Sequence, residues 1–204
     1  MQTLEFFFDC FSPWTYLGFE SLQQLHARHP DLKVFYRPIL VGGIFNTINP
    51  SVYASRENPV KPKLQYQRKD LQDWAEYVGI TVKHMSELPV FPVNSVKAMR
   101  GAIYADEVGK LVPYARRVFE IYWSEGKDIS QDDVLKEVVS EVKLDMVEYF
   151  DKIKDQKYKD ALKDNTEEVM ARGGYGTPTI FLNKTDMFFG NDRFPLIEAK
   201  LNKA

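Results

Sequence analysis

The chain has 204 residues, with 27 basic and 29 acidic side chains and a formal net charge of −2. Basic residues are matched by acidic ones and do not gather in one stretch, and no run of about eighteen apolar residues occurs, so we expect neither a nucleic-acid-binding surface nor a membrane span. The single cysteine, Cys10, excludes an internal disulfide, and a reducing cytoplasmic location is the simplest expectation.

The first part of the chain predicts a β–α–β unit. Residues 3–8 are apolar and rich in phenylalanine, which is typical of a strand that is buried on both faces. A helix is predicted over residues 13–29, because Ser12 is a good N-cap and Pro13 suits the first helical position. Residues 32–36 predict a second strand, and the β–α–β order favours a parallel pair with a right-handed crossover.

The rest of the chain predicts helices followed by a hairpin. Residues 46–62 predict a long irregular loop, of a length that is usually functional or mobile. Helical spacing of apolar residues then extends over residues 63–173, and strand signals return as a hairpin over 178–189. A terminal helix follows, with Asn191 or Asp192 as its predicted cap. This order indicates an α/β sheet domain that is interrupted by a helical domain.

The turn between the first strand and the first helix is the first candidate site. A helix that starts at the end of a buried strand offers unpaired N–H groups and the positive end of its dipole, which suit a thiolate, carboxylate or phosphate. The Ser12 hydroxyl can donate a hydrogen bond to sulfur, and such a bond beside a helix N-terminus favours the thiolate. The alternative is that Ser12 only caps the helix.

The remaining candidate ligands and nucleophiles have simpler structural interpretations. Cys10 precedes the turn, and a buried thiol at the end of the strand is the favoured interpretation. The three histidines, His26, His29 and His84, show no metal-binding spacing with one another or with Cys10, so we expect no metal site.

Two features of the chain resemble the thioredoxin superfamily, which places its active turn between the first strand and the first helix. The turn 12–15, Ser-Pro-Trp-Thr, stands where that superfamily has Cys-x-x-Cys, and Thr177-Pro178 matches its cis-proline. Within the superfamily the chain resembles the kappa-class glutathione transferases and, more closely, the bacterial 2-hydroxychromene-2-carboxylate isomerases. The supporting segments keep the family's order along the chain: FDCFSPWTYLG (8–18), RPILVGGIF (37–45), KLQY (63–66), FPVNS (91–95), GTPTIF (176–181) and GNDR (190–193).

The resemblance implies an α/β protein with a thioredoxin-like fold that is interrupted by an inserted all-helical domain. Residues 1–60 and 157–204 are expected to form the thioredoxin-like domain, and residues 61–156 the helical domain. A homodimer is also expected from the family.

The resemblance also implies glutathione as the cofactor, with a set of residues to bind it: Ser12, Asn49, Lys63, Thr177, Pro178, Asn191 and Asp192. Ser12 is expected to be catalytic, because its hydroxyl holds the glutathione thiolate. A cis bond before Pro178 points the backbone of Thr177 into the cleft, where it pairs with the cysteinyl unit. An ordinary proline at a strand start is the alternative for Pro178.

The two ends of glutathione need different partners. In the resembled family a pair at the position of Asn191 and Asp192 binds the γ-glutamyl end, while a plain N-cap is the rival interpretation. Lys63 is the candidate cation for the glycyl carboxylate, with Asn49 as a further polar contact. A solvated side chain is the alternative for Lys63.

The implied activity is a glutathione-dependent isomerase of the 2-hydroxychromene-2-carboxylate type. The bound thiolate adds reversibly to a conjugated carbon of a small aromatic substrate, which allows rotation about the former double bond. A kappa-class transferase that releases the adduct is one alternative. A DsbA-like thiol–disulfide oxidoreductase is another, although the chain lacks the resolving cysteine that such exchange needs. The third is a non-catalytic binding module on the same fold.

Overall fold

The computed structural model describes residues 2–203 and contains one mixed sheet in the order β2–β1–β3–β4. The first strand β1 (Thr3–Phe8) pairs in parallel with β2 (Lys33–Pro38), as the β–α–β order predicts. On its other side β1 runs antiparallel to β3 (Thr179–Leu182), which pairs with β4 (Asp186–Phe189). The two central strands of the sheet, β1 and β3, therefore come from opposite ends of the chain.

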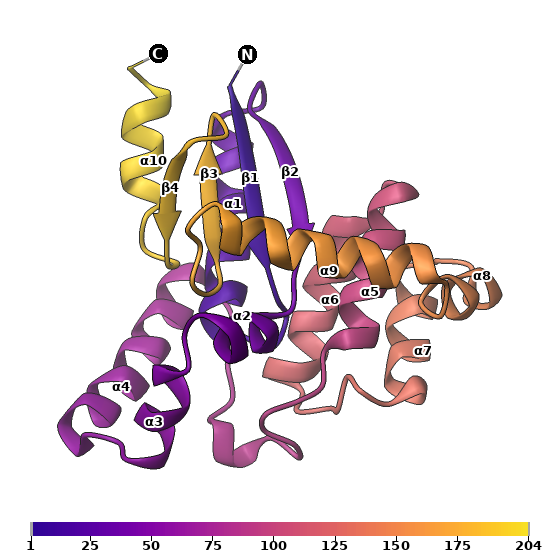
Figure 1. Ribbon diagram of the computed structural model, residues 1–204, viewed down its shortest axis with the longest axis horizontal. Helices are drawn as coiled ribbons and strands as arrows, with labels where there is room; N and C mark the ends of the chain where they lie inside the picture. Colours follow the sequence, from indigo (N-terminus) through magenta and orange to yellow (C-terminus); the bar gives the residue numbers. More distant parts are fainter. Residues whose placement is uncertain (1, 204) are drawn as a thin grey trace.

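Helices cover both faces of this sheet. The helix α1 (Pro13–Arg28) lies behind it in Figure 1, and α9 (Gln156–Ala171) crosses its front. Phe6 packs against Phe19 of α1, with ring centroids 6.4 Å apart, whereas Phe7 joins the smaller core on the side of α9. Because alternate side chains of a strand point to opposite faces, both faces of β1 need apolar residues. This confirms the prediction made from residues 3–8.

The chain between β2 and β3 is largely helical and extends beside and below the sheet (Figure 1). Its elements before α9 are α2 (Val41–Thr47), α3 (Ser51–Glu57), α4 (Lys61–Val78), a 3₁₀ turn (Met85–Glu87), α5 (Val96–Glu107), α6 (Leu111–Phe119) with a π-helical turn (Glu120–Ser124), α7 (Asp132–Glu141) and α8 (Met146–Lys152). The final helix, α10 (Phe194–Leu201), follows β4. The predicted α/β sheet with an inserted helical region is confirmed, while its domain boundaries stay a prediction.

The prediction of an irregular loop over residues 46–62 is wrong. Helix α3 occupies its middle, and the first turn of α4 occupies its end. Two of the three prolines in this segment stand at helix starts: Pro50 is the N-cap of α3, and Pro62 lies in the first turn of α4, while Pro59 lies in the short connection between the two helices. Proline is tolerated at a helix start because those N–H groups have no intrahelical partner.

The inserted helices pack directly against the turn that follows β1. The Trp123 indole N–H donates to the Cys10 carbonyl at 3.0 Å, and the Cys10 N–H contacts the Met99 sulfur at 3.4 Å. Tyr16 of α1 stacks on Phe119 of α6, with ring centroids 5.0 Å apart and nearly parallel planes. The turn before α1 is therefore held by the helical region as well as by the sheet.

Candidate active site

Ser12 stands at the N-cap of α1, as predicted. Its backbone is extended, with φ −94° and ψ 123°, and its Oγ accepts a hydrogen bond from the Thr15 N–H at 3.3 Å. This bond uses one lone pair of the hydroxyl and leaves its hydrogen able to donate. The side chain is mostly buried, with 9% of the residue exposed. The N-cap role of Ser12 is confirmed, and a donor role toward sulfur is compatible with it and stays a prediction.

The loop before β3 lies against this turn. The peptide bond between Thr177 and Pro178 is cis, as predicted. The hydroxyls of Thr177 and Thr15 are hydrogen-bonded at 2.9 Å, and the Asp9 N–H donates to the Thr177 Oγ1 at 3.3 Å. Three segments that are far apart in the sequence therefore meet where α1 begins.

Pro178 also packs on α1, and this contact explains a glycine. A Cβ atom added to Gly18 would lie 3.0 Å from Cγ of Pro178 and 3.6 Å from Cα of Asn191. The helix and the loop approach closely because Gly18 has no side chain.

Asn191 belongs to the same group of residues. The Gly190 N–H donates to the Pro178 carbonyl at 3.1 Å, which places Asn191 beside the cis-prolyl loop. Asn191 is 7% exposed, and within residues 2–203 its buried Nδ2 has no hydrogen-bond partner. A buried amide without a partner is unusual, because leaving such a donor unpaired costs about 1–3 kcal/mol.

Asn191 and Asp192 do not cap the last helix, so that prediction is wrong. Arg193 occupies the N-cap of α10 and makes no capping hydrogen bond with its side chain. The Asp192 carboxylate instead accepts from the Arg193 guanidinium at 3.0 Å. Gly190, directly after β4, takes a left-handed conformation with φ 103°, and the turn that contains Asn191 and Asp192 follows it.

The two predicted residues from the segment before α4 differ in their placement. The Asn49 amide donates to the Tyr175 carbonyl at 3.1 Å, so it reaches the loop that leads to Thr177. Lys63 is exposed on α4, and among the described residues no hydrogen bond or ion pair links it to the rest of the site. The structure brings Ser12, Thr177, Pro178 and Asn191 together, whereas the place of Lys63 in the site stays a prediction.

Asp9 also belongs to the candidate site, although it is not among the residues predicted from the sequence. It is 2% exposed, and its carboxylate accepts from the Phe11 N–H at 3.0 Å and from the Val41 N–H at 2.9 Å. Burial raises the pKa of Asp9 above its usual value, although these two bonds and one from the Ser95 hydroxyl lower it. The signal in the sequence is an acidic residue at the end of an apolar strand, which needs buried partners.

Cys10 is buried, as predicted, and is not placed for exchange. Burial, and to a lesser extent the neighbouring Asp9 carboxylate, raises the pKa of the Cys10 thiol well above its usual value. Since the thiolate is the reactive form, we expect this buried thiol to be unreactive in the folded protein.

We therefore expect Ellman's reagent to leave Cys10 unmodified in the native protein near neutral pH and to modify one thiol per chain after unfolding in guanidinium. Ser12→Cys is the matched control, because it places a thiol at the helix start, where the helix dipole lowers a thiol pKa. That variant should react in the native state. A mixed disulfide between glutathione and Cys10 in the native protein would contradict the expectation.

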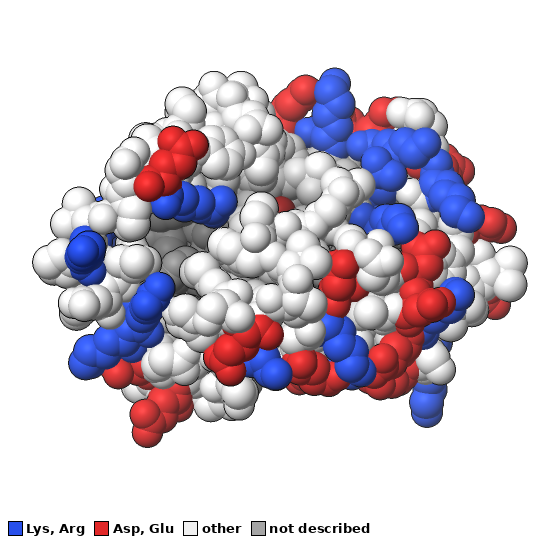
Figure 2. Space-filling view, turned by 90° about the horizontal axis from the view of Figure 1, so that it is seen from below, with Lys and Arg blue, Asp and Glu red and all other residues white. Residues whose placement is uncertain are grey.

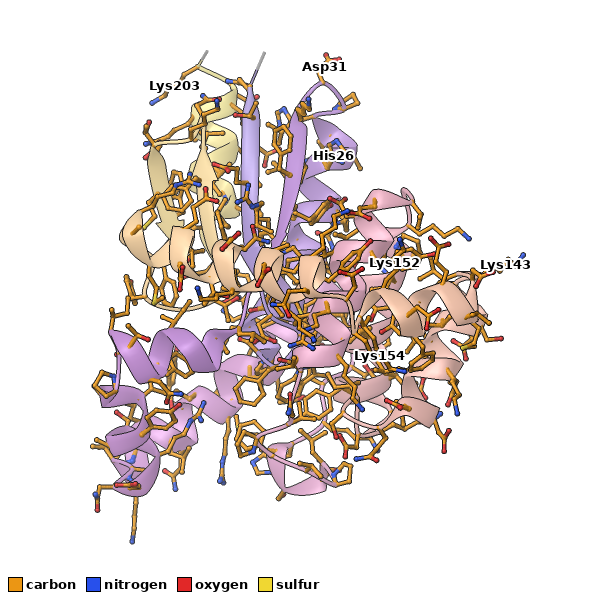
Figure 3. The ribbon with its side chains drawn as sticks, turned by 45° about the vertical axis from the view of Figure 1, so that its right-hand side comes forward. His26, Asp31, Lys143, Lys152, Lys154 and Lys203 are labelled. Atoms are coloured by element: carbon orange, nitrogen blue, oxygen red, sulfur yellow. The ribbon has the colours of Figure 1, made fainter. Side chains whose placement is uncertain are left out.

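Two surface hollows lie away from this site. One is at the opposite end of β1, among Arg28, Asp31 and Lys184, near the position of Asp31 in Figure 3. The other lies along α8 and includes Lys152. Within residues 2–203 no cluster of three metal-ligating side chains occurs, and no helix is both long and apolar enough to cross a membrane.

The sheet order, the inserted helices and the cis-prolyl loop facing the start of α1 define a thioredoxin-like protein whose active turn has no cysteine pair. A family model for the DsbA-like thioredoxin domain matches residues 3–202. The chain therefore belongs to the DsbA-like thioredoxin family.

Curated relatives cover nearly the full chain. The 2-hydroxychromene-2-carboxylate isomerase of Pseudomonas putida is 29% identical over 98% of this chain and 94% of its own. The enzyme of the same name from Pseudomonas sp. strain C18 is 30% identical over 98% and 91%. Human glutathione S-transferase kappa 1 is 26% identical over 99% and 92%. These relatives are isomerases and glutathione transferases.

Solved structures show the same fold. A 2-hydroxychromene-2-carboxylate isomerase superposes with a TM-score of 0.81 at 24% identity, covering 98% of this chain and 95% of the other. The cytosolic disulfide reductase DsbM from Pseudomonas aeruginosa, solved with GSH, gives a TM-score of 0.65 at 17% identity, with 98% and 99% covered. At these identities the likeness concerns the fold alone.

Proposed function

We propose that this protein is a glutathione-dependent isomerase of the 2-hydroxychromene-2-carboxylate type. The observation that carries the proposal is the position of the Ser12 hydroxyl, at a capped helix start beside the loop of Thr177 and Pro178. A serine cannot exchange disulfides, but its hydroxyl can hold the thiolate of a bound thiol. Relatives with isomerase and transferase names support this class of activity.

Glutathione binding in this proposal uses groups that the fold already orders. The backbone of Thr177 pairs with the cysteinyl unit, which places its sulfur near Ser12. The buried amide of Asn191, which has no partner within residues 2–203, is available to the γ-glutamyl end, with Asp192 beside it. Asn49, whose amide donates to the Tyr175 carbonyl, is the further polar contact for the glycyl end of glutathione. Lys63, exposed in the first turn of α4, is the candidate cation for the glycyl carboxylate.

The reaction begins with a thiolate whose pKa is lowered by the Ser12 hydroxyl and by the start of α1. The substrate reacts in its ring-opened form, in which the hemiketal of the chromene has opened to a phenol and a conjugated ketone. The sulfur forms a bond to the carbon β to that ketone, and the electron pair of the double bond moves onto the ketone oxygen. Rotation about the resulting single bond is then free. The electron pair returns, the carbon–sulfur bond breaks, and glutathione is regenerated.

A kappa-class transferase is the second candidate, because human glutathione S-transferase kappa 1 matches over nearly the whole chain. The first step is identical, but protonation of the adduct replaces loss of the thiolate, and the conjugate leaves as product. The homodimer and the cytoplasmic location expected from the sequence stay predictions.

Titration with glutathione tests the proposal directly. We expect saturable binding, and we expect the thiolate absorbance of the bound tripeptide to develop at a lower pH than that of free glutathione. The protein should then isomerise 2-hydroxychromene-2-carboxylate with glutathione present in catalytic amounts. The transferase instead consumes one glutathione for each substrate.

S-methylglutathione is the matched control ligand, because it keeps both carboxylates but has no thiol to ionise. It should bind and inhibit without supporting turnover. If glutathione does not bind, or binds with an unchanged thiol pKa, the proposed function is wrong. Binding without either reaction favours the non-catalytic module.

A further inference from the structure

Arg56, on α3, has an environment that the proposed function does not use. Its guanidinium carbon lies 5.7 Å from the ring centroids of Phe11 and Phe45, 5.8 Å from that of Phe91 and 6.0 Å from that of Tyr53. These distances are at the outer limit of cation–π contacts. We call these five side chains the Arg56 cluster.

The rings of the Arg56 cluster form two pairs from separate parts of the chain. Phe11 and Phe91 stack with centroids 5.4 Å apart, and Phe45 meets Tyr53 edge to face at 6.2 Å. The guanidinium lies near all four rings and so connects α3 to the turn before α1. A guanidinium that rests on aromatic faces keeps its N–H edge available for a planar acceptor.

No acidic side chain occupies that edge. Other arginines of the chain form close ion pairs, such as Arg28 with Glu198 at 2.7 Å and Arg116 with Glu20 at 2.7 Å. Within residues 2–203 no carboxylate oxygen lies within 4 Å of an Arg56 nitrogen, and the residue is exposed. From below, both basic and acidic side chains border a hollow in the part of the surface formed by α3 and α4 (Figure 2). Among the described residues, the cluster therefore presents a cation near four aromatic rings that has no carboxylate partner.

The position of this cation relates it to the candidate active site. Phe11, whose ring lies near the guanidinium, directly precedes Ser12. The ring therefore belongs to the turn at which, in the proposed function, the glutathione thiolate is bound. An aromatic substrate with a carboxylate has both features that the cluster can recognise, a flat apolar face and a bidentate acceptor. The glycyl end of glutathione has a carboxylate but no aromatic part.

We propose that Arg56 binds the carboxylate of the aromatic substrate and orients it toward the sulfur held at Ser12. Arg56 is then a specificity-determining residue, and this role in turnover rests on the proposed function. Charged hydrogen bonds of this kind account for about tenfold to a hundredfold in affinity.

A binding experiment without glutathione tests the cation independently of catalysis. Cinnamate and cinnamamide have the same aromatic conjugated frame, and only cinnamate carries a carboxylate. By calorimetric titration we expect the wild-type protein to prefer cinnamate, and Arg56→Gln to lose about tenfold or more of that preference. Arg68→Gln on α4 is the matched control, an exposed arginine without an ion pair among the described residues. It should behave as wild type.

Steady-state kinetics and glutathione binding together distinguish whether Arg56 binds the carboxylate of the substrate or the glycyl carboxylate of glutathione. Arg56→Gln should lower kcat/KM for 2-hydroxychromene-2-carboxylate by about tenfold or more, because the variant loses both the binding and the orientation of the substrate carboxylate, and it should leave the affinity for glutathione unchanged. Weaker binding of glutathione, but not of its glycine amide, would instead assign Arg56 to the glycyl carboxylate and overturn the proposal. Equal binding of cinnamate and cinnamamide, or no binding of either, overturns it as well. If the protein prefers cinnamate to cinnamamide but does not bind glutathione, the proposed function is wrong while Arg56 is still a binding site for the carboxylate of an aromatic ligand.

Discussion

Ser12→Ala is expected to raise the pKa of the bound glutathione thiol and to lower turnover by roughly tenfold to a thousandfold, by analogy with the loss of one oriented donor at an anionic centre. The hydroxyl has two partners in this proposal. Its oxygen accepts from the Thr15 N–H, and its hydrogen donates to the sulfur. Alanine removes both. The thiolate absorbance of the complex as a function of pH, measured beside kcat, separates a change in ionisation from a change in binding.

The cap must be separated from the donor, because losing an N-cap by itself costs about 1 kcal/mol of stability. Ser12→Asp keeps an oxygen that can cap α1, but it offers no donor at neutral pH and repels a thiolate. It should restore the free energy of unfolding without restoring turnover. Ser12→Thr keeps the hydroxyl and should restore both in large part. An alanine variant with unchanged thiol pKa and rate would show that Ser12 acts only as a cap.

The parts of the site that the sequence predicts are those with local signals. Ser12 and Pro13 mark a helix start by their own backbone preferences, and the apolar run before them marks a strand. These signals act within a few residues, so no knowledge of distant contacts is needed. The cis bond at Pro178 has no such signal, because most X–Pro bonds are trans. Its prediction depended on the family resemblance.

The parts that escaped prediction depend on contacts between distant segments. The ring of Phe91 reaches Phe11 only because the segment before α5 folds over the first turn. Arg56 joins them only because residues 51–57 form a helix, which the surrounding prolines concealed. Asp9 likewise acquires two of its partners, the Val41 N–H of α2 and the Ser95 hydroxyl, from segments that are distant in the sequence; only the Phe11 N–H is local. Hydrophobic spacing identifies elements, but it does not identify which polar groups meet between them.

Asp9→Ala is expected to lower the free energy of unfolding by about 2 to 6 kcal/mol, because the buried N–H groups of Phe11 and Val41 each lose their acceptor at about 1–3 kcal/mol. That is a large share of the 5–15 kcal/mol typical of a folded protein. Urea denaturation measures the change. Asp145→Ala is the matched control, since that exposed carboxylate accepts only the Glu148 N–H, at 2.8 Å, as a helix cap. It should cost about 1 kcal/mol.

The pH dependence of stability tests the ionisation of Asp9 separately from its hydrogen bonds. Because burial raises the folded-state pKa of Asp9, the folded protein binds its proton more tightly than the unfolded chain does. The stabilising contribution of that proton is fully present below the unfolded pKa, near 3.9, and is lost as the pH rises through the folded pKa. The amide side chain of the Asp9→Asn variant does not titrate. The variant loses stability by an amount that does not depend on pH, because the NH₂ group of the amide faces a backbone N–H donor. The free energy of unfolding of the wild type, relative to Asp9→Asn, should therefore fall as the pH rises from about 4. The contrary result is a wild type that gains stability relative to Asp9→Asn as the pH rises over that range. It would mean that the hydrogen bonds to the carboxylate outweigh its burial. Asp9 would then have a lower pKa in the folded protein than in the unfolded chain.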